Sequence, residues 1–362
     1  MRPAARRAGL VAGVAGLVAA GAAVGLAAER YAIGRIRRGP DPAAGEGFGH
    51  LPADRVRTVR ADDGIRLYVE EVGRPDAALT VIFVHGYALS QGCWHYQRLG
   101  LADMRVRLVC YDQRSHGRSE HAPGETATID QLGRDLGAVL DQVAPRGRVA
   151  LVGHSMGGMT VLALAAARPE LFGGRIAGVA LLSTSTGRLA DVTLGLPAAL
   201  ARLRAPVLPV LLRGMRSRAK LVERTRRIGS DIAWLLTRRY SFGSPDVSPA
   251  LVEYVGQMIA ATPVDVLADF YPALVGYDKL AALPVLRPIP TLIMVGDKDL
   301  LTPVEHSRAM AAELPDAELV VVAGAGHLAM MERDALVNLH LRAFLHRAAR
   351  AGSGRRANER KA

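Results

Sequence analysis

Residues 149–167 have the sequence VALVGHSMGGMTVLALAAA, which combines three structural signals. Val149–Val152 is a continuous apolar run, as expected of a strand buried on both faces. Met156–Ala167 is an alanine-rich apolar run that predicts a helix. Between them, Gly153-His154-Ser155-Met156-Gly157 fits the pattern G-x-S-x-G. In this pattern a sharp strand-to-helix turn exposes the serine hydroxyl at the carboxyl end of a sheet.

Strand patterns alternate with helical patterns along most of the chain. Further strands are predicted at Val56–Arg60, Ile65–Val72, Leu79–Val84, Val106–Tyr111, Ile176–Leu182, Thr291–Val295 and Leu319–Val322. Further helices are predicted at Ala88–Leu101, Thr128–Val143, Pro303–Glu313 and Asp334–His346. This alternation predicts an α/β fold with a mostly parallel sheet and helices on both faces. The turn signal Asp62-Asp63-Gly64 between the first two strands predicts a leading hairpin, which makes the sheet mixed.

The alternation also divides the chain into a core and an insertion. Residues 56–186 and 287–346 carry the strand–helix pattern. The segment between them, 187–286, is too long for a loop and has proline-interrupted helical patterns, so we expect a helical lid or cap there. Residues 39–55 are rich in Gly, Pro and Ala and predict a linker. Residues 347–362 form a basic tail.

The N-terminal segment, residues 1–38, contains an uncharged run of 21 residues, Ala8–Ala28, with arginines on both sides. A helix of this length spans the hydrocarbon core of a bilayer. We therefore expect a single-pass anchor in the cell membrane. The alternative is a cleaved signal peptide, which would make the protein secreted. Three arginines precede the run and four follow it, so the flanking charges leave the orientation open.

Positive charge is concentrated in three segments. The net charge is +12, and residues 1–40, 201–240 and 341–362 carry +6, +9 and +6, so the remainder is acidic. This distribution favours an anionic membrane surface over nucleic acid as a partner. Aromatic residues are only 5% of the chain, too few to suggest base-stacking platforms, and no nucleic-acid module is recognisable. A lid that rests on a bilayer through residues 201–240 is one hypothesis, and a solvated cap is the alternative.

A serine nucleophile needs a base, and the base needs an orienting carboxylate. We predict that His327, which follows the last strand in Gly324-Ala325-Gly326-His327, is the base. Asp297 and Asp299 follow the strand before it. Asp299 is better placed to turn back toward the site, and Asp297 to hold the turn, so Asp299 is the predicted acid. The order Ser155, Asp299, His327 is the chain order expected for this turn motif.

Two backbone amides are predicted to bind the oxyanion. One belongs to Met156, which follows the nucleophile, and the other to Tyr87 in His85-Gly86-Tyr87. Three other histidines in loops, His85, His116 and His154, are expected to pack or hydrogen-bond. No metal or cofactor is expected, because His and Cys lack ligand spacing and no phosphate-binding glycine motif follows a strand. Whether Cys93 and Cys110 form a disulfide is left open.

Taken together, the motifs resemble those of the α/β-hydrolase superfamily. The similarity lies in Val84-His85-Gly86-Tyr87, Tyr111–Ser119, Gly153–Gly158, Gly296-x-x-Asp299 and Gly324-x-Gly326-His327. They are most similar to the lid-bearing bacterial branch of esterases, lipases and cofactor-free haloperoxidases. The resemblance covers roughly residues 56–346 and implies an eight-stranded, mostly parallel sheet and an acyl-enzyme mechanism. It also implies that Asp112–Ser119 is a structural loop.

The sequence therefore predicts a serine hydrolase that cleaves hydrophobic or acyl-lipid carboxylic esters. Ser155 in place of an aspartate speaks against the haloalkane dehalogenase and epoxide hydrolase branches. An acyltransferase or thioesterase on the same catalytic scaffold is the first alternative. A non-catalytic, membrane-tethered interaction protein is the second.

Overall fold

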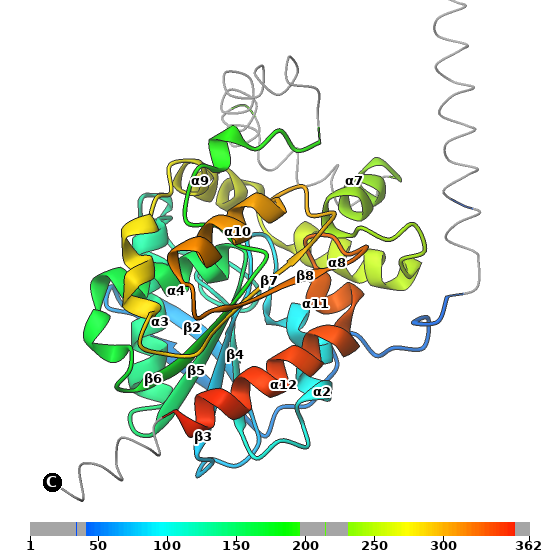
Figure 1. Cartoon of the computed structure of the whole chain (residues 1–362). Coiled ribbons are helices and arrows are strands. Elements are labelled where there is room, and N and C mark those ends of the chain that lie inside the picture. The colour runs from blue at the N-terminus through cyan, green and yellow to red at the C-terminus, as the bar shows by residue number, and fades with distance from the viewer. Residues whose placement is uncertain (1–33, 35–40, 196–213, 215–230, 352–362) are drawn as a thin grey trace, which may run out of the picture.

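The computed structural model describes residues 41–195 and 231–351, together with Gly34 and Gly214 (Figure 1). The predicted anchor at Ala8–Ala28 lies outside these residues, as does most of the basic block at 201–240. The apolar segment Val207–Leu212 of the predicted lid is also outside them.

The described residues include one sheet of eight strands in the order β1-β2-β4-β3-β5-β6-β7-β8. Their bounds are β1 Arg55–Arg60, β2 Arg66–Val72, β3 Leu79–Val84, β4 Arg107–Tyr111, β5 Arg148–His154, β6 Ile176–Leu182, β7 Thr291–Gly296 and β8 Glu318–Val322. β2 is antiparallel to β1 and to β4, and every other neighbouring pair is parallel. The predicted fold class, an eight-stranded and mostly parallel sheet, is confirmed.

Helices cover both faces of this sheet (Figure 1). One face carries α2 His95–Gly100, α11 Ala329–Glu332 and α12 Asp334–Arg350, and the other carries α3 Ile129–Val143, α4 Met156–Ala167 and α10 Val304–Glu313. Successive residues of β3 serve opposite faces: Val81 and Phe83 pack on the first side, and Ile82 and Val84 on the second. A strand that is apolar at every position is thus explained by burial on both faces.

One predicted helix is much shorter than expected. The sequence predicts a helix over Ala88–Leu101, but the structure has a 3-10 turn at Gln91–Trp94 followed by α2. Ala88 has a positive φ of 59°, a left-handed conformation that an α-helix cannot include. Ser90 then caps the 3-10 turn by accepting a hydrogen bond from Gly92 N. The left-handed residue therefore delays the helix.

Three cap helices come from the predicted insertion: α7 Asp231–Ser241, α8 Pro249–Ala261 and α9 Val264–Val275. In Figure 1 they lie together at one end of the sheet. The predicted cap extends to residue 286, whereas the 3-10 segment Leu280–Leu286 belongs to the core layer. Its Leu283 and Leu286 are buried in the cluster that also contains α3 and α4 residues. The described cap helices therefore end at Val275.

The described part of the predicted linker, residues 41–54, docks on the protein. Asp41 Oδ2 accepts a hydrogen bond from Ala250 N of α8 at 2.7 Å. Phe48 stacks on Tyr254 of α8, with ring centroids 4.8 Å apart. The carbonyl of Pro52 accepts a hydrogen bond from Arg98 of α2 at 2.7 Å. This segment thus joins the cap to the core.

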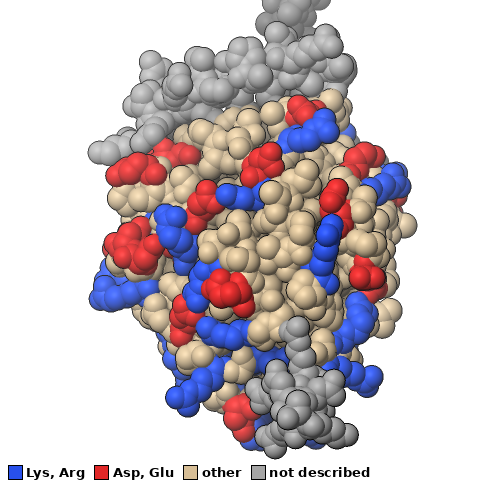
Figure 2. Space-filling model, turned by 60° about the vertical axis from the view of Figure 1, so that its left-hand side comes forward, with Lys and Arg blue, Asp and Glu red and all other residues tan. Residues whose placement is uncertain are grey.

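None of the described helices is by itself both long and apolar enough to cross a membrane. α8 and α9 meet that criterion only as a pair bent by 92°. On the face shown in Figure 2, basic and acidic side chains are interspersed. Cys93 and Cys110 are both buried and form no disulfide.

A buried ion pair fixes the loop after β4. Arg114 is fully buried, and its Nε donates to Asp135 Oδ2 of α3 at 2.6 Å. Its Nη1 donates to Asp63 Oδ2 in the β1–β2 turn at 2.8 Å. Burial raises the pKa of Asp135, although its hydrogen bond with Arg114 opposes that effect. Arg114 therefore ties the leading hairpin, the loop and α3 together.

We expect Asp135→Ala to lower the free energy of unfolding by about 3–5 kcal/mol, because it leaves the Arg114 charge buried without its main partner. Urea unfolding followed by circular dichroism measures this. Glu305→Gln, which breaks the exposed pair between Glu305 and Arg308, serves as the control and should change stability by at most about 1 kcal/mol. Equal effects of the two substitutions would contradict the structural role of Arg114.

Candidate active site

Ser155 sits at a strained turn between β5 and α4. Its φ of 53° and ψ of −119° lie in a region that non-glycine residues rarely adopt. Two glycines make the turn possible. A Cβ on Gly153 would lie 2.6 Å from the carbonyl oxygen of Gly157, and a Cβ on Gly157 would lie 2.0 Å from the carbonyl oxygen of Val84. The spacing of the predicted G-x-S-x-G motif therefore corresponds to two close backbone contacts.

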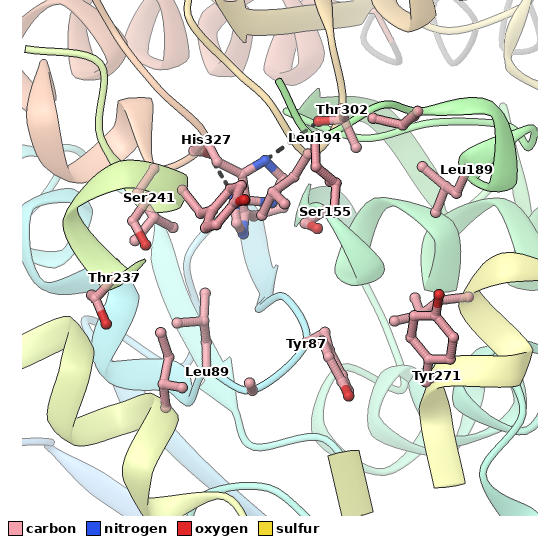
Figure 3. Close-up of a pocket in the computed structure, with 18 of the residues that line it drawn as sticks. Tyr87, Leu89, Ser155, Leu189, Leu194, Thr237, Ser241, Tyr271, Thr302 and His327 are labelled. Carbon is pink, nitrogen blue, oxygen red and sulfur yellow. Dashed lines mark hydrogen bonds between the residues drawn. The ribbon is translucent and has the colours of Figure 1, made fainter. Parts of the chain in front are cut away.

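The end of β6 holds the strained residue from both sides. Ser155 N donates to the carbonyl of Leu182 at 3.0 Å. Thr184 Oγ1 donates to the carbonyl of Ser155 at 2.7 Å. Strain of this kind persists only where the surroundings over-determine it. These two bonds supply that restraint and leave the Ser155 side chain facing the cavity in Figure 3.

Asp299 and His327 form a buried pair. His327 Nδ1 lies 3.0 and 2.9 Å from the two carboxylate oxygens of Asp299. Burial alone would raise the pKa of Asp299. The charge of His327 and the hydrogen bonds from His327 and Thr302 outweigh burial and hold this pKa below its ordinary value. A carboxylate kept ionised at this position fixes the imidazole tautomer, because Nδ1 must carry the proton and Nε2 is left as the base.

Asp297 occupies a different position. Its Oδ1 accepts a hydrogen bond from Gly324 N at 2.7 Å, which joins the turn after β7 to the loop after β8. It is therefore Asp299, and not Asp297, that contacts His327 in the structure.

His85 orients the peptide that precedes Tyr87. Its Nε2 accepts a hydrogen bond from Gln113 N at 2.9 Å, so Nδ1 carries the proton and donates to the carbonyl of Gly86 at 2.8 Å. Burial lowers the pKa of His85 to about 3, so the ring stays neutral. Because the peptide unit is planar and trans, fixing the Gly86 carbonyl also fixes the direction of the Tyr87 N–H. The second candidate donor, Met156, is the first residue of α4.

His154 is a buried, neutral neighbour of His327, the predicted base. Its Nε2 lies 2.9 Å from the carbonyl of His327, to which it donates. Burial, together with the nearby His327, lowers the pKa of His154 to about 3. Its ring packs against the His327 ring, with centroids 4.8 Å apart. His154 therefore holds the His327 backbone without placing a second positive charge beside it.

The loop at Asp112–Ser119 supports the turn that carries Tyr87. Asp112 Oδ1 accepts a hydrogen bond from Gln91 N at 2.7 Å, and Oδ2 accepts one from Arg118 N at 2.9 Å. Burial raises the pKa of Asp112 to about 6. In this loop His116 is also buried, and burial lowers its pKa to about 4.

A cavity of about 390 Å³ lies beside Ser155, His327 and Tyr87 (Figure 3). Ser155 and His327 line it from the core, and Tyr87 lies on its wall in the same view. Its remaining walls come largely from the cap and are mostly apolar; they include Leu189, Leu194, Leu236, Ile259, Leu274 and Val275. A concave, mostly apolar space with a few convergent polar groups is typical of a small-molecule site.

Two supporting residues were not predicted from the sequence. Thr302 donates to Asp299 from both its backbone N and its Oγ1, at 2.9 and 2.8 Å. The spacing Asp299-x-x-Thr302 is a side-chain turn signal that could have indicated it. Glu332 accepts hydrogen bonds from Gly326 N at 2.7 Å and from Gly243 N at 3.0 Å, which ties the His327 loop to the end of α7. No local sequence pattern predicts the contacts of Glu332.

Among residues 41–195 and 231–351, no group of three or more His, Cys, Asp or Glu side chains is arranged to hold a metal ion.

Comparison with known proteins identifies the family. Residues 80–334 match the alpha/beta hydrolase fold family, and the chain belongs to it. The solved structure of a thermophilic esterase from Thermogutta terrifontis is 28% identical, has a TM-score of 0.63, and covers 82% of this chain and 99% of its own. A non-heme haloperoxidase from Rhodococcus erythropolis is 27% identical over 295 residues, which cover 79% of this chain and 98% of that protein. The predicted superfamily is confirmed, and these relatives support a hydrolase.

A shorter match has higher identity. A non-heme chloroperoxidase from Streptomyces lividans is 36% identical over 126 residues, which cover 35% of this chain. The aligned part spans 44% of that protein's length.

We expect Gly157→Ala to lower the thermal unfolding midpoint by several degrees, because the added Cβ would force α4 and β3 apart. Gly137→Ala on α3 is the matched control. A Cβ there meets its nearest neighbour at 3.5 Å, an ordinary contact. That variant should keep or raise the midpoint, because glycine is unfavourable inside a helix. Differential scanning calorimetry distinguishes the two, and an unchanged midpoint for Gly157→Ala would contradict the close contact.

Proposed function

We propose that this protein is a serine hydrolase that cleaves carboxylic esters through an acyl-enzyme intermediate. The observation that carries the proposal is the buried contact between Asp299 and His327, in the same cavity as a serine held at a strained strand-to-helix turn. A serine, a histidine and an orienting carboxylate are the groups that acyl transfer needs. The two esterase and haloperoxidase relatives are consistent with this reaction.

In the proposed first step, Ser155 Oγ attacks the ester carbonyl carbon while His327 Nε2 takes the hydroxyl proton. The tetrahedral oxyanion is stabilised by the N–H groups of Met156 and Tyr87. The intermediate then collapses as the bond from the carbonyl carbon to the alcohol oxygen breaks. His327 gives its proton to that oxygen, so the alcohol leaves neutral and the acyl group stays on Ser155.

In the second step, water repeats the sequence. His327 takes a proton from water, and the resulting nucleophile attacks the acyl carbon. Collapse of the second tetrahedral intermediate returns the proton to Ser155 Oγ and releases the carboxylic acid. Throughout, Asp299 stabilises the protonated imidazole and stays ionised itself, which agrees with its lowered pKa.

The apolar lining of the cavity favours hydrophobic esters. Each methylene of the substrate moved from water into such a lining contributes about 0.8 kcal/mol. The location of the protein at a membrane, through the predicted anchor in residues 1–38, stays a prediction.

We expect Ser155→Ala to reduce ester hydrolysis at least about a thousandfold, since the oxyanion donors and binding alone leave little catalysis. Release of p-nitrophenol from esters of increasing chain length measures the rate. A fluorophosphonate probe should label the wild-type protein at Ser155 and leave the variant unlabelled. Residual turnover above about a thousandth of wild type would show that Ser155 is not the nucleophile.

The two aspartates provide a second test. Asp299→Asn should lower kcat by orders of magnitude, because an amide can stabilise the wrong imidazole tautomer. Asp297→Asn should cost much less, since its carboxylate contacts the backbone N of Gly324 and not His327. Steady-state kinetics of both variants, with circular dichroism to verify folding, give the ranking. The reverse order would make Asp297 the functional acid.

A further inference from the structure

Two hydroxyl side chains on α7 line the mostly apolar cavity. Thr237 and Ser241 are one helical turn apart, so they lie on the same face of the helix. Their exposed fractions are only 8% and 7%. In Figure 3 both stand on the side of the cavity away from Leu189 and Tyr271, with Ser155 between the two sides.

Neither hydroxyl has a hydrogen-bond partner within the described part of the chain. Both side chains are more than nine-tenths buried as a whole, and both line the cavity. Two other buried threonines, Thr160 on α4 and Thr262 just after α8, each donate to a backbone carbonyl four residues earlier. The hydroxyls of Thr237 and Ser241 are therefore available to a group that enters the cavity.

Backbone contacts place this end of α7 beside His327. Leu328 N donates to the carbonyl of Ser241 at 2.8 Å. Glu332 accepts hydrogen bonds from Gly326, just before His327, and from Gly243, just after α7. The position of Ser241 is thus fixed relative to the proposed base by contacts on both sides of it.

The position of His327 determines which part of an ester lies near these hydroxyls. His327 must reach the alcohol oxygen in order to protonate it as it leaves. The alcohol portion of a bound ester therefore lies on the His327 side of the cavity, toward α7. The acyl portion then points to the opposite side, where Leu189 and the ring of Tyr271 lie (Figure 3).

We propose that Thr237 and Ser241 select esters whose alcohol portion carries a free hydroxyl or a similar hydrogen-bonding group, joined to an apolar acyl chain. Esters of short diols and polyols belong to this class. The inference rests on the proposed ester hydrolysis and adds which half of the substrate is polar. A substrate hydroxyl can both donate to and accept from these side chains, so it would pair the two groups that the protein leaves unpaired.

Matched ester pairs test the proposal. The first pair is 2-hydroxyethyl and propyl hexanoate, which differ by a hydroxyl for a methyl at the end of the alcohol. The second pair is the propyl esters of 6-hydroxyhexanoic and heptanoic acid, which differ in the same way at the end of the acyl chain. In the wild-type protein, kcat/KM should favour the hydroxyl member of the first pair by about three- to tenfold and the apolar member of the second pair.

The double variant Thr237→Val, Ser241→Ala keeps the shape of the cavity and removes both hydroxyls. Its preference within the first pair should fall at least about tenfold and favour propyl hexanoate, because the substrate hydroxyl would then be buried unpaired. The preference within the second pair should stay within about twofold of wild type, because the acyl chain lies away from both hydroxyls. Thr262→Val is the control, since it removes a buried cap hydroxyl that does not line the cavity, and it should leave both ratios unchanged.

The outcomes separate this inference from the proposed function. Absence of turnover on every ester overturns ester hydrolysis and the inference with it. If the propyl esters are turned over, two results overturn the inference alone. One is a wild-type kcat/KM ratio of about one within the first pair. The other is the same first-pair ratio in the double variant as in the wild-type protein. If the double variant changes the kcat/KM preference only within the second pair, the hydroxyls face the acyl portion and not the alcohol portion. That result also overturns the inference.

Discussion

The close approach of α4 to β3 is the constraint on which the candidate site depends. It exists because Gly157 has no side chain where a Cβ would lie 2.0 Å from the carbonyl oxygen of Val84. This contact brings the first residue of α4, Met156, next to the loop after β3 that carries Tyr87. The same tight turn forces Ser155 into its positive φ. The proposed nucleophile and both proposed oxyanion donors thus take their positions from one packing contact between backbones.

Burial distinguishes the histidines around Ser155 by their ability to carry a proton. It lowers the pKa of His85 and His154 to about 3 and that of His116 to about 4. Each of these rings contacts a backbone carbonyl, so each serves to position a loop. Of His85, His116, His154 and His327, only His327 hydrogen-bonds a carboxylate, that of Asp299. His327, the proposed base, therefore has neutral imidazoles as neighbours rather than adjacent positive charges.

Most of the fold was predictable because its signals are local. The bounds of β3, β6 and α4 match their predicted ranges, since apolar runs between glycine-containing turns depend on neighbouring residues alone. The prediction failed where a single backbone angle decided the outcome, as at Ala88, or where distant segments meet. Glu332 contacts Gly243 across 89 residues of sequence. No periodicity or spacing encodes such a contact, and the docking of residues 41–54 on α8 was missed for the same reason.

The cap is joined to both halves of the proposed machinery. Tyr87, the proposed oxyanion donor, donates from its side-chain hydroxyl to the carbonyl of Leu267 in α9 at 2.5 Å. The His327 loop is tied to the end of α7 through Glu332 and Leu328. Residues that would contact the substrate therefore share hydrogen bonds with the loops that would perform the chemistry. A cap substitution that shifts α7 or α9 would move His327 or Tyr87 as well, so under the proposed function it would change both substrate selection and turnover. Substitutions such as Thr237→Val alter a side chain and leave these hydrogen bonds in place. Such changes can therefore separate substrate selection from turnover.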